Sequence, residues 1–318
     1  MEQNISPSEW LSAVKSDYLD DFIKQGGAAV KFAVVRNEST LTEVREGLSG
    51  LARDAGFIYT AVSAEQTKIH FIEQIFFQVA RQLDWDALAL RFMRAMLNQQ
   101  YNVPENDCDF TLDNLAMLNG YAPRDMRPAI NTRLEKHLFK DYAMTQEFRI
   151  AMMHLCRRQL DCDEVHEHVY LAVKEWLRGE LRLISTLKSA FIYQKISRVN
   201  GRNMLYSLAR WLRLCGYNGL VLVLDISRYT QDRLREPDGS FYYSTSAVMD
   251  CFEVLRQFID STDEAGHCFI TVIAPQRFVE LDDKRGVGSY DALKLRIWDE
   301  VHDKRLVNPL APLVRFTV

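Results

Sequence analysis

Glycine and proline are scarce in this 318-residue chain, which contains 14 and 8 of them respectively. That scarcity excludes a collagen-like or low-complexity protein, and the 47% of hydrophobic residues excludes a disordered one. No run approaches the roughly 18 apolar residues that a membrane-spanning helix needs, so we expect no membrane partner. The first ten residues, MEQNISPSEW, lack the basic and apolar regions of a secretory signal.

Paired cysteines are also lacking, because the six cysteines are scattered and none forms a CxxC motif. In a chain of this length, such cysteines indicate reduced thiols and a cytoplasmic location. Cys156, Cys162, His166 and His168 crowd one stretch, but their spacing is not that of a zinc site. On a helix, histidines two residues apart would point to different faces, so no metal site is predicted.

Five apolar runs predict β-strands, at residues 30–35, 57–62, 220–225, 269–274 and 313–318. Because they are apolar at nearly every position, we expect strands that are covered on both faces. Thr40 and Glu43 have the spacing of a capping box, which predicts a helix from about residue 40 to Gly56. A strand, a helix and a second strand at this spacing predict a parallel sheet with right-handed crossovers.

Residues 84–215 show helical patterning without a strand signal, which is too long for a simple crossover helix. We therefore predict an α/β fold in which residues 1–83 and 216–318 form a parallel sheet of about five strands. A large helical insertion at 84–215 would separate the second strand from the third.

The order of strand, turn and helix, with a later strand that ends in Asp225, is the layout of P-loop ATPases. In such a site, backbone N–H groups and a helix N-terminus hold the phosphates, and the aspartate holds Mg²⁺ through water. An aspartate at the end of a strand also occurs as a simple turn or cap residue, so Asp225 alone leaves both interpretations open.

Three stretches carry a resemblance to a known family: residues 18–32, residues 207–213 with the approach through Gly216 and Tyr217 to Asp225, and residues 285–296. They resemble the BREX-system ATP-binding proteins, a branch of AAA+-like P-loop ATPases of bacterial anti-phage defence. The resemblance implies a P-loop NTPase-like sheet, ATP as the family's ligand, and other protein subunits of a defence complex as partners.

The sequence departs from that family where nucleotide chemistry takes place. Arg36, Asn37, Glu38, Ser39 and Thr40 stand at the phosphate-loop position, without glycine or lysine, in a turn of about four residues. The family places glutamate after the aspartate, whereas Ile226 follows Asp225 here and accepts no proton. We therefore predict no catalytic residues and no cofactor, with binding of ATP and Mg²⁺ as an open alternative. AAA+ proteins normally continue from the fifth strand into a helical lid, and the sequence predicts no lid domain.

Two sets of basic residues could make contacts with partners. Arg296 is interpreted either as a surface arginine in a salt bridge or as an arginine that reaches a neighbouring subunit. From Arg178 to Arg213 there are eight basic residues and one acid, in a chain of net charge −4. A basic helix with Phe191 and Tyr193 could bind nucleic acid, or it could be a solvated face paired with acids. The candidate contacts to nucleic acid are Lys188, Lys195, Arg198 and Arg202.

Together these features predict a catalytically inactive, P-loop ATPase-like subunit that acts as a scaffold or adaptor in a defence or DNA-transaction complex. One alternative is a genuine ATP-binding switch with an atypical phosphate loop. Another is a nucleic-acid-binding module that uses residues 178–213. Other protein subunits are the expected partners, with DNA, RNA or a second copy of the chain as further possibilities.

Overall fold

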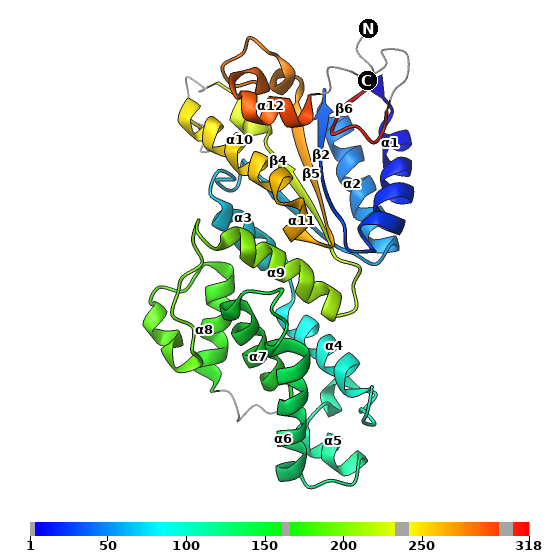
Figure 1. The fold of residues 1–318 in the computed structure, drawn as a ribbon, viewed down its shortest axis with the longest axis vertical. Helices are drawn as coiled ribbons and strands as arrows, with labels where there is room; N and C mark the ends of the chain where they lie inside the picture. Colours follow the sequence, from blue (N-terminus) through cyan, green and yellow to red (C-terminus); the bar gives the residue numbers. More distant parts are fainter. Residues whose placement is uncertain (1–3, 161–165, 233–241, 299–307, 318) are drawn as a thin grey trace. The chain divides into compact units, whose positions relative to one another are not determined.

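The structure is a computed structural model that describes residues 4–160, 166–232, 242–298 and 308–317. The chain divides into two compact units (Figure 1). One unit combines Met1–Val79 with Tyr217–Val318 and is called the α/β unit here. The other comprises Ala80–Gly216 and is called the helical unit.

The α/β unit is built on a parallel sheet of six strands in the order β1-β6-β2-β5-β4-β3. The strands are β1 (Asn4–Ile5), β2 (Ala28–Val35), β3 (Ile58–Ser63), β4 (Leu220–Asp225), β5 (Cys268–Pro275) and β6 (Leu313–Phe316). The prediction of about five strands missed β1, because two residues carry no pattern of alternation or apolar run. Val318, the last residue of the predicted fifth run, lies outside the described residues.

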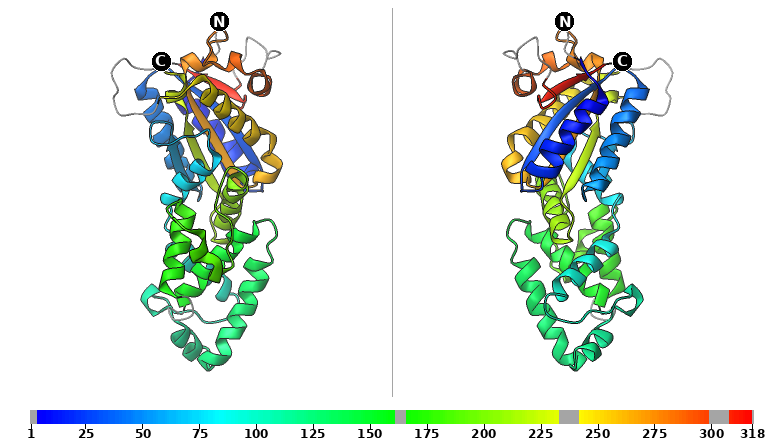
Figure 2. Two further views of the ribbon diagram at one scale, coloured as in Figure 1. Left: turned by 90° about the vertical axis from the view of Figure 1, so that its left-hand side faces the viewer. Right: turned by 90° about the vertical axis from the view of Figure 1, so that its right-hand side faces the viewer.

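The centre of the sheet is covered on both faces, as the apolar runs predicted. For β3 and β6 that prediction is wrong, because their buried residues alternate with half-buried ones. All six residues of β4 are buried, and so are the first seven of β5. Helix α2 (Glu38–Asp54) packs against β2, β3 and β4 on one face. Helix α10 (Thr245–Asp260) lies on the opposite side of the strands, as Figure 2 shows. The helices and strands therefore form three layers.

Other helices complete the α/β unit. They are α1 (Pro7–Ala13), the π-helix Val14–Phe22, most of α3 (Ile72–Arg81), α11 (Thr262–Ala265) and α12 (Asp291–Ile297). Trp10 of α1 is fully buried and meets the ring of Phe316 edge-on, at 5.5 Å between centroids. Large aromatic side chains contribute much of the apolar area that a core buries, so this pair holds α1 against the sheet.

The helical unit contains six further α-helices in its described part. They are α4 (Trp85–Leu97), α5 (Leu112–Leu118), α6 (Pro123–Leu134), α7 (Gln146–Leu160), α8 (Glu167–Arg178) and α9 (Gly201–Leu214). Asp86 of α4 accepts hydrogen bonds from Lys174 Nζ at 2.7 Å, Tyr170 Oη at 2.6 Å and Gln159 Nε2 at 3.3 Å. One carboxylate therefore joins α4 to both α7 and α8.

Lys31 is an unusual residue for the centre of a sheet. Its side chain lies in β2 with 7% of the residue exposed. Its Nζ donates a hydrogen bond to the carbonyl of Leu310 at 2.5 Å and lies 4.7 Å from the ring centroid of Tyr18. Burial lowers the pKa of Lys31 to about 8, because an ammonium group loses hydration there without a carboxylate among the described residues to pair with it.

The lowered pKa of Lys31 predicts a pH-dependent cost to folding. Between pH 8 and 10.5 the unfolded chain binds more protons at this residue than the folded chain, so stability rises with pH in that window. We expect Lys31→Met to be more stable than the wild type at pH 7, by about 1–2 kcal/mol. The difference should shrink between pH 8 and 10. Urea unfolding at a series of pH values measures it, and a difference that does not change with pH would contradict the expectation.

Candidate functional site at the carboxyl edge of the sheet

The sheet contains a reversal of strand order beside its first long strand. The chain passes from β2 to β3 in one direction, and then through β4 and β5 to β6 in the other. Neighbouring strands β2 and β5 are therefore followed by connections that leave in opposite directions. In open α/β sheets, ligands bind outside the carboxyl ends of the strands at such a switch point. The residues that follow Val35 and Pro275 consequently border the candidate site.

The connection after β2 is only two residues long, Arg36 and Asn37. Asn37 is the N-cap of α2, and its side-chain oxygen accepts a hydrogen bond from the Thr40 N–H at 2.8 Å. The predicted cap at Thr40 is therefore wrong, because the helix begins at Glu38 and Thr40 is a buried residue of its first turn. The capping-box spacing of Thr40 and Glu43 occurs inside the helix, where no cap is needed.

This connection does not fit a triphosphate in the manner of a Walker A loop. A phosphate cradle needs several free backbone N–H groups around the first turn of the helix. Here the Asn37 side chain takes one of them, and the exposed Glu38 carboxylate adds negative charge to that turn. Arg36 and Ser39 are exposed beside it, so the five predicted residues lie together at the helix N-terminus without forming a cradle.

Asp225 at the end of β4 is committed to partners within its own unit. Its Oδ2 lies 2.7 Å from Nη2 of Arg45, in the third turn of α2, and its Oδ1 accepts the Ser227 N–H at 2.9 Å. The Asp225 side chain is 10% exposed, and that of Arg45 is 30% exposed. Strand β5 separates β4 from β2, so Asp225 lies two strand spacings, roughly 10 Å, across the sheet from β2.

The Arg45 partner was not found from the sequence, although a signal exists. Arg45 follows Leu41 by four residues and Val44 by one, so it lies at the margin of the buried face of α2. A charged residue on such a margin needs an opposite charge when it is half-buried. The next residue after Asp225, Ile226, is fully buried, and its N–H donates to the carbonyl of Ile273 at 2.9 Å.

The loops that follow β3 and β4 are joined by a buried aromatic cluster. The rings of Tyr229 and Tyr243 stack at 3.9 Å between centroids. Tyr243 Oη donates to the carbonyls of Ala64 at 2.7 Å and Thr67 at 2.9 Å, and the Tyr229 hydroxyl accepts the His70 N–H at 2.9 Å. Burial raises the pKa of both tyrosines, so both hydroxyls stay protonated and remain hydrogen-bond donors.

Arg285 joins the loop after β5 to the same cluster. Only 6% of this residue is exposed, and its Nη1 donates to the carbonyls of Tyr229 at 3.0 Å and Tyr243 at 2.9 Å. Its Nη2 donates to the Tyr242 hydroxyl at 2.7 Å. The next residue, Gly286, has no room for a side chain, because a Cβ there would lie 2.2 Å from the Glu280 carbonyl oxygen. Hydrogen bonds therefore join the loops after β3 and β5 to the described ends of the loop after β4, at Tyr229 and at Tyr242 and Tyr243.

Arg296 lies on α12 and pairs with Asp260 of α10 in the same chain. Its Nη2 is 2.9 Å from Asp260 Oδ2, and its Nε forms a second bond to the same carboxylate. Asp260 also pairs with Arg256. The structure therefore places Arg296 in an exposed ion-pair network within the chain, which is the first of its two interpretations.

The basic stretch from Arg178 to Arg213 is not one helix, so that part of the prediction is wrong. It comprises the end of α8, a 3₁₀-helix over Ile184–Ala190, an irregular stretch and then α9. The serine-rich and β-branched sequence of residues 184–197 forms no continuous α-helix in the structure. Lys188, Lys195 and Arg198 are exposed, and Arg202, in the first turn of α9, is half-buried.

Residues that could hold a metal ion do not cluster in the part of the chain that the structure describes. His166 is the N-cap of α8 rather than a helical residue, so its ring stacks on that of His168 at 5.6 Å. The expectation that the two rings point to different faces is therefore wrong. Cys162 lies outside the described residues.

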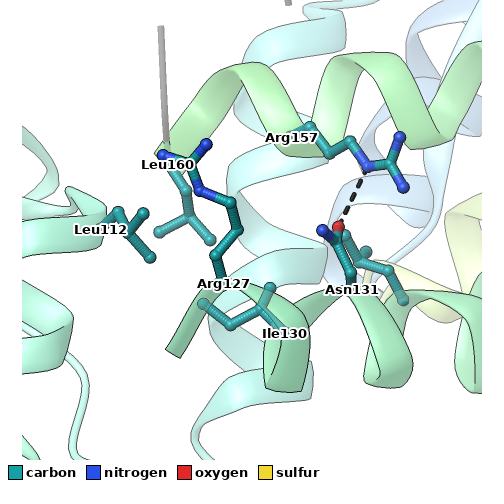
Figure 3. A pocket seen from close by; sticks show the side chains of 7 residues that line it. Leu112, Arg127, Ile130, Asn131, Arg157 and Leu160 are labelled. Carbon is teal, nitrogen blue, oxygen red and sulfur yellow. Dashed lines mark hydrogen bonds between the residues drawn. The ribbon is translucent and has the colours of Figure 1, made fainter. Parts of the chain in front are cut away.

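A pocket in the helical unit lies between α5, α6 and α7 (Figure 3). Its walls are mostly aliphatic, with Leu112, Ile130 and Leu160 among them. The Arg157 Nε donates to Asn131 Oδ1 at 3.1 Å on one side. The guanidinium of Arg157 is therefore hydrogen-bonded to another residue that lines the pocket.

Comparison with known families decides the assignment. The family described as BREX system ATP-binding protein BrxC/D matches residues 119–318, which is more than half of the chain. The chain belongs to this family. The resemblance seen in the sequence is thereby confirmed, and membership of a BREX family indicates a role in anti-phage defence. The matched residues include Asp225, Arg285 and Arg296, but the stretches 18–32 and 36–40 precede them.

No curated protein and no solved structure matches the chain. Within its described residues, this BREX-family chain has no helix with the length and apolar character that crossing a membrane requires.

The Arg45–Asp225 pair predicts an unequal cost of its two single substitutions. We expect Arg45→Met to destabilise the protein by about 2 kcal/mol, because it leaves a buried carboxylate without its cation. Asp225→Asn should cost less, since the half-buried guanidinium of Arg45 can reach water. The double variant should be more stable than the sum of the two single effects by about 1 kcal/mol or more. Urea unfolding of all four proteins measures this coupling.

Arg53→Met is the matched control, because Arg53 is an exposed arginine near the end of the same helix. We expect that change to alter stability by less than about 0.5 kcal/mol. Strictly additive effects at Arg45 and Asp225 would show that the two side chains do not stabilise one another.

Proposed function

We propose that this BREX-family chain is a non-hydrolysing subunit with a P-loop-like sheet, which acts as a scaffold or adaptor among other protein subunits. The observation that carries the proposal is the Arg45–Asp225 ion pair beside a two-residue connection after β2. In a P-loop ATPase the aspartate at this position would orient the water shell of Mg²⁺. Here Asp225 accepts hydrogen bonds from the Arg45 guanidinium and the Ser227 N–H instead. A positive charge supplied by the protein takes the place of the metal.

Hydrolysis of ATP at this edge would need groups that stabilise the charge on the transferred phosphoryl group, and a base that activates water. A developing phosphoryl charge is normally stabilised by backbone N–H groups, a lysine and a metal ion. The connection Arg36–Asn37 offers no lysine, and the fully buried Ile226 offers no base. The hydrogen bonds of Arg285 to Tyr229 and Tyr243 favour a surface for protein contact at these residues.

Nucleotide should therefore leave the purified protein unchanged. We expect millimolar ATP with Mg²⁺ to shift the melting temperature by less than about 1 °C. A ligand that did bind, at a hundred times its Kd, would stabilise the folded protein by about 2.7 kcal/mol and give a larger shift. We also expect no phosphate release. Affinity purification of the tagged chain from its native host should retain other proteins, whether or not ATP is present.

A genuine ATP-binding switch is the alternative that these measurements address. A saturable rise in melting temperature with ATP and Mg²⁺, but not with Mg²⁺ alone, would support it and refute the nucleotide-free subunit. If the chain emerges alone and monomeric from its host, the scaffold proposal fails. If it emerges as a homo-oligomer, the partner is a second copy.

A second candidate function is binding of nucleic acid by the basic residues of the helical unit. The exposure of Lys188, Lys195 and Arg198 favours it. Exposed cations bind phosphates and release counterions, which makes affinity fall as salt rises.

Charge reversal tests this second function. We expect Arg198→Glu with Arg202→Glu to weaken binding of an oligonucleotide and to reduce the slope of log affinity against log salt by about 1 or more. Fluorescence anisotropy at several salt concentrations measures both quantities. Arg124→Glu is the control, since Arg124 is an exposed arginine of the same unit outside this stretch. Binding that does not depend on salt, or no binding, refutes this function.

A further inference from the structure

An exposed aromatic surface lies on residues 181–200 of the helical unit, here called the 181–200 segment. Phe191 is 66% exposed and Tyr193 is 59% exposed, whereas Ile192 between them is fully buried. Leu183 and Val199 of the same segment are also exposed. Large apolar side chains concentrated on so short a stretch indicate a contact surface, because isolated exposed residues are common but gathered ones are not.

The backbone beneath these side chains is held by hydrogen bonds from two helices. Trp176 Nε1 of α8 donates to the Gln194 carbonyl at 2.9 Å, and the His154 Nε2 of α7 lies 3.2 Å from the Ala190 carbonyl oxygen. Lys195 Nζ donates to the Arg182 carbonyl at 2.8 Å, which closes the segment on itself.

Buried side chains reinforce this anchoring, since Leu187, Ala190, Ile192 and Ile196 are at most 6% exposed. Phe191 itself adopts a left-handed backbone conformation with φ of 59° at the end of the 3₁₀-helix. The exposed rings are therefore attached to a backbone that is already ordered. Binding of a ligand to them costs little conformational entropy of the segment.

The charge of the 181–200 segment selects an anionic ligand. It contains four basic residues, Arg182, Lys188, Lys195 and Arg198, and no aspartate or glutamate. All four basic residues are exposed.

We propose that the 181–200 segment binds single-stranded nucleic acid, with bases stacked on Phe191 and Tyr193 and phosphates held by Lys188, Lys195 and Arg198. This inference rests on the second function proposed above and names its ligand class. Aromatic rings stack on the faces of unpaired bases, and a basic surface follows the backbone between them. In a duplex those faces are hidden by stacking, so exposed rings add nothing to its binding. An acidic peptide would satisfy the cations but offers no flat face to the rings.

The test compares two DNAs on the full-length chain. Fluorescence anisotropy gives the affinity for an oligothymidine and for a duplex of equal length, and polyglutamate serves as an acidic competitor. We expect Phe191→Ala with Tyr193→Ala to weaken oligothymidine binding at least about tenfold, and duplex binding by less than about twofold. Tyr121→Ala, which removes a 54% exposed ring of the same unit, should change neither affinity.

A ring-conserving variant guards against damage to the fold. Phe191→Tyr with Tyr193→Phe keeps both rings and should bind oligothymidine like the wild type. Equal binding of both DNAs that is unaffected by loss of the rings overturns the single-strand proposal, while salt-dependent binding through the basic residues stands. Absence of binding to either DNA overturns both. Polyglutamate that displaces oligothymidine and itself binds in a ring-dependent manner would identify an acidic protein segment as the ligand instead.

Discussion

The arrangement of the carboxyl edge depends on one ion pair, between Arg45 of α2 and Asp225 of β4. Opposite charges that are partly withdrawn from water attract strongly, but each also loses hydration, so the pair is stable only when both ends are positioned well. The parallel register of β4 with β3 and β5 fixes Asp225, and packing of α2 across three strands fixes Arg45. The pair links α2 to the end of β4, and only two residues connect the same helix to β2.

The loops above this edge are held in a different way, by a cation that has no carboxylate in its closest contacts. Arg285 donates to two backbone carbonyls and one hydroxyl, so the guanidinium joins the two described ends of the loop after β4. The carboxylate that pairs with Arg285 is that of Asp232, whose Oδ1 lies 3.6 Å from Arg285 Nε. Asp232 also pairs with Arg277. A planar group with five donors suits this task because it can satisfy several acceptors without moving. Arg285 thereby links two of the loops at the edge where related architectures hold ligands.

Much of the fold follows from local sequence, and much of the candidate site does not. Strands β2, β4 and β5 could be located because a strand that is buried on both faces is apolar throughout, and Pro275 marks where β5 ends. The start of α2 was misplaced because Asn37 and Thr40 are both good caps, and only the length of the connection distinguishes them. The Arg45–Asp225 pair joins residues 180 positions apart, and no pattern within one element encodes such a contact. The 181–200 segment shows the same limit, since its cations were visible in the sequence but its irregular backbone depends on Trp176 and His154.

The register of the sheet has a consequence for synthesis of the chain. Val30 in β2 pairs with Ile270 in β5, and Phe32 pairs with Leu313 in β6, so both neighbours of β2 are made about 240 residues or more after it. At usual rates of translation of 5–20 residues per second, that interval is on the order of ten seconds or more. The whole helical unit emerges in the meantime. During that time β2 presents two unpaired, apolar edges. The backbone groups along those edges find their partners in the sheet only after β5 and β6 have been made.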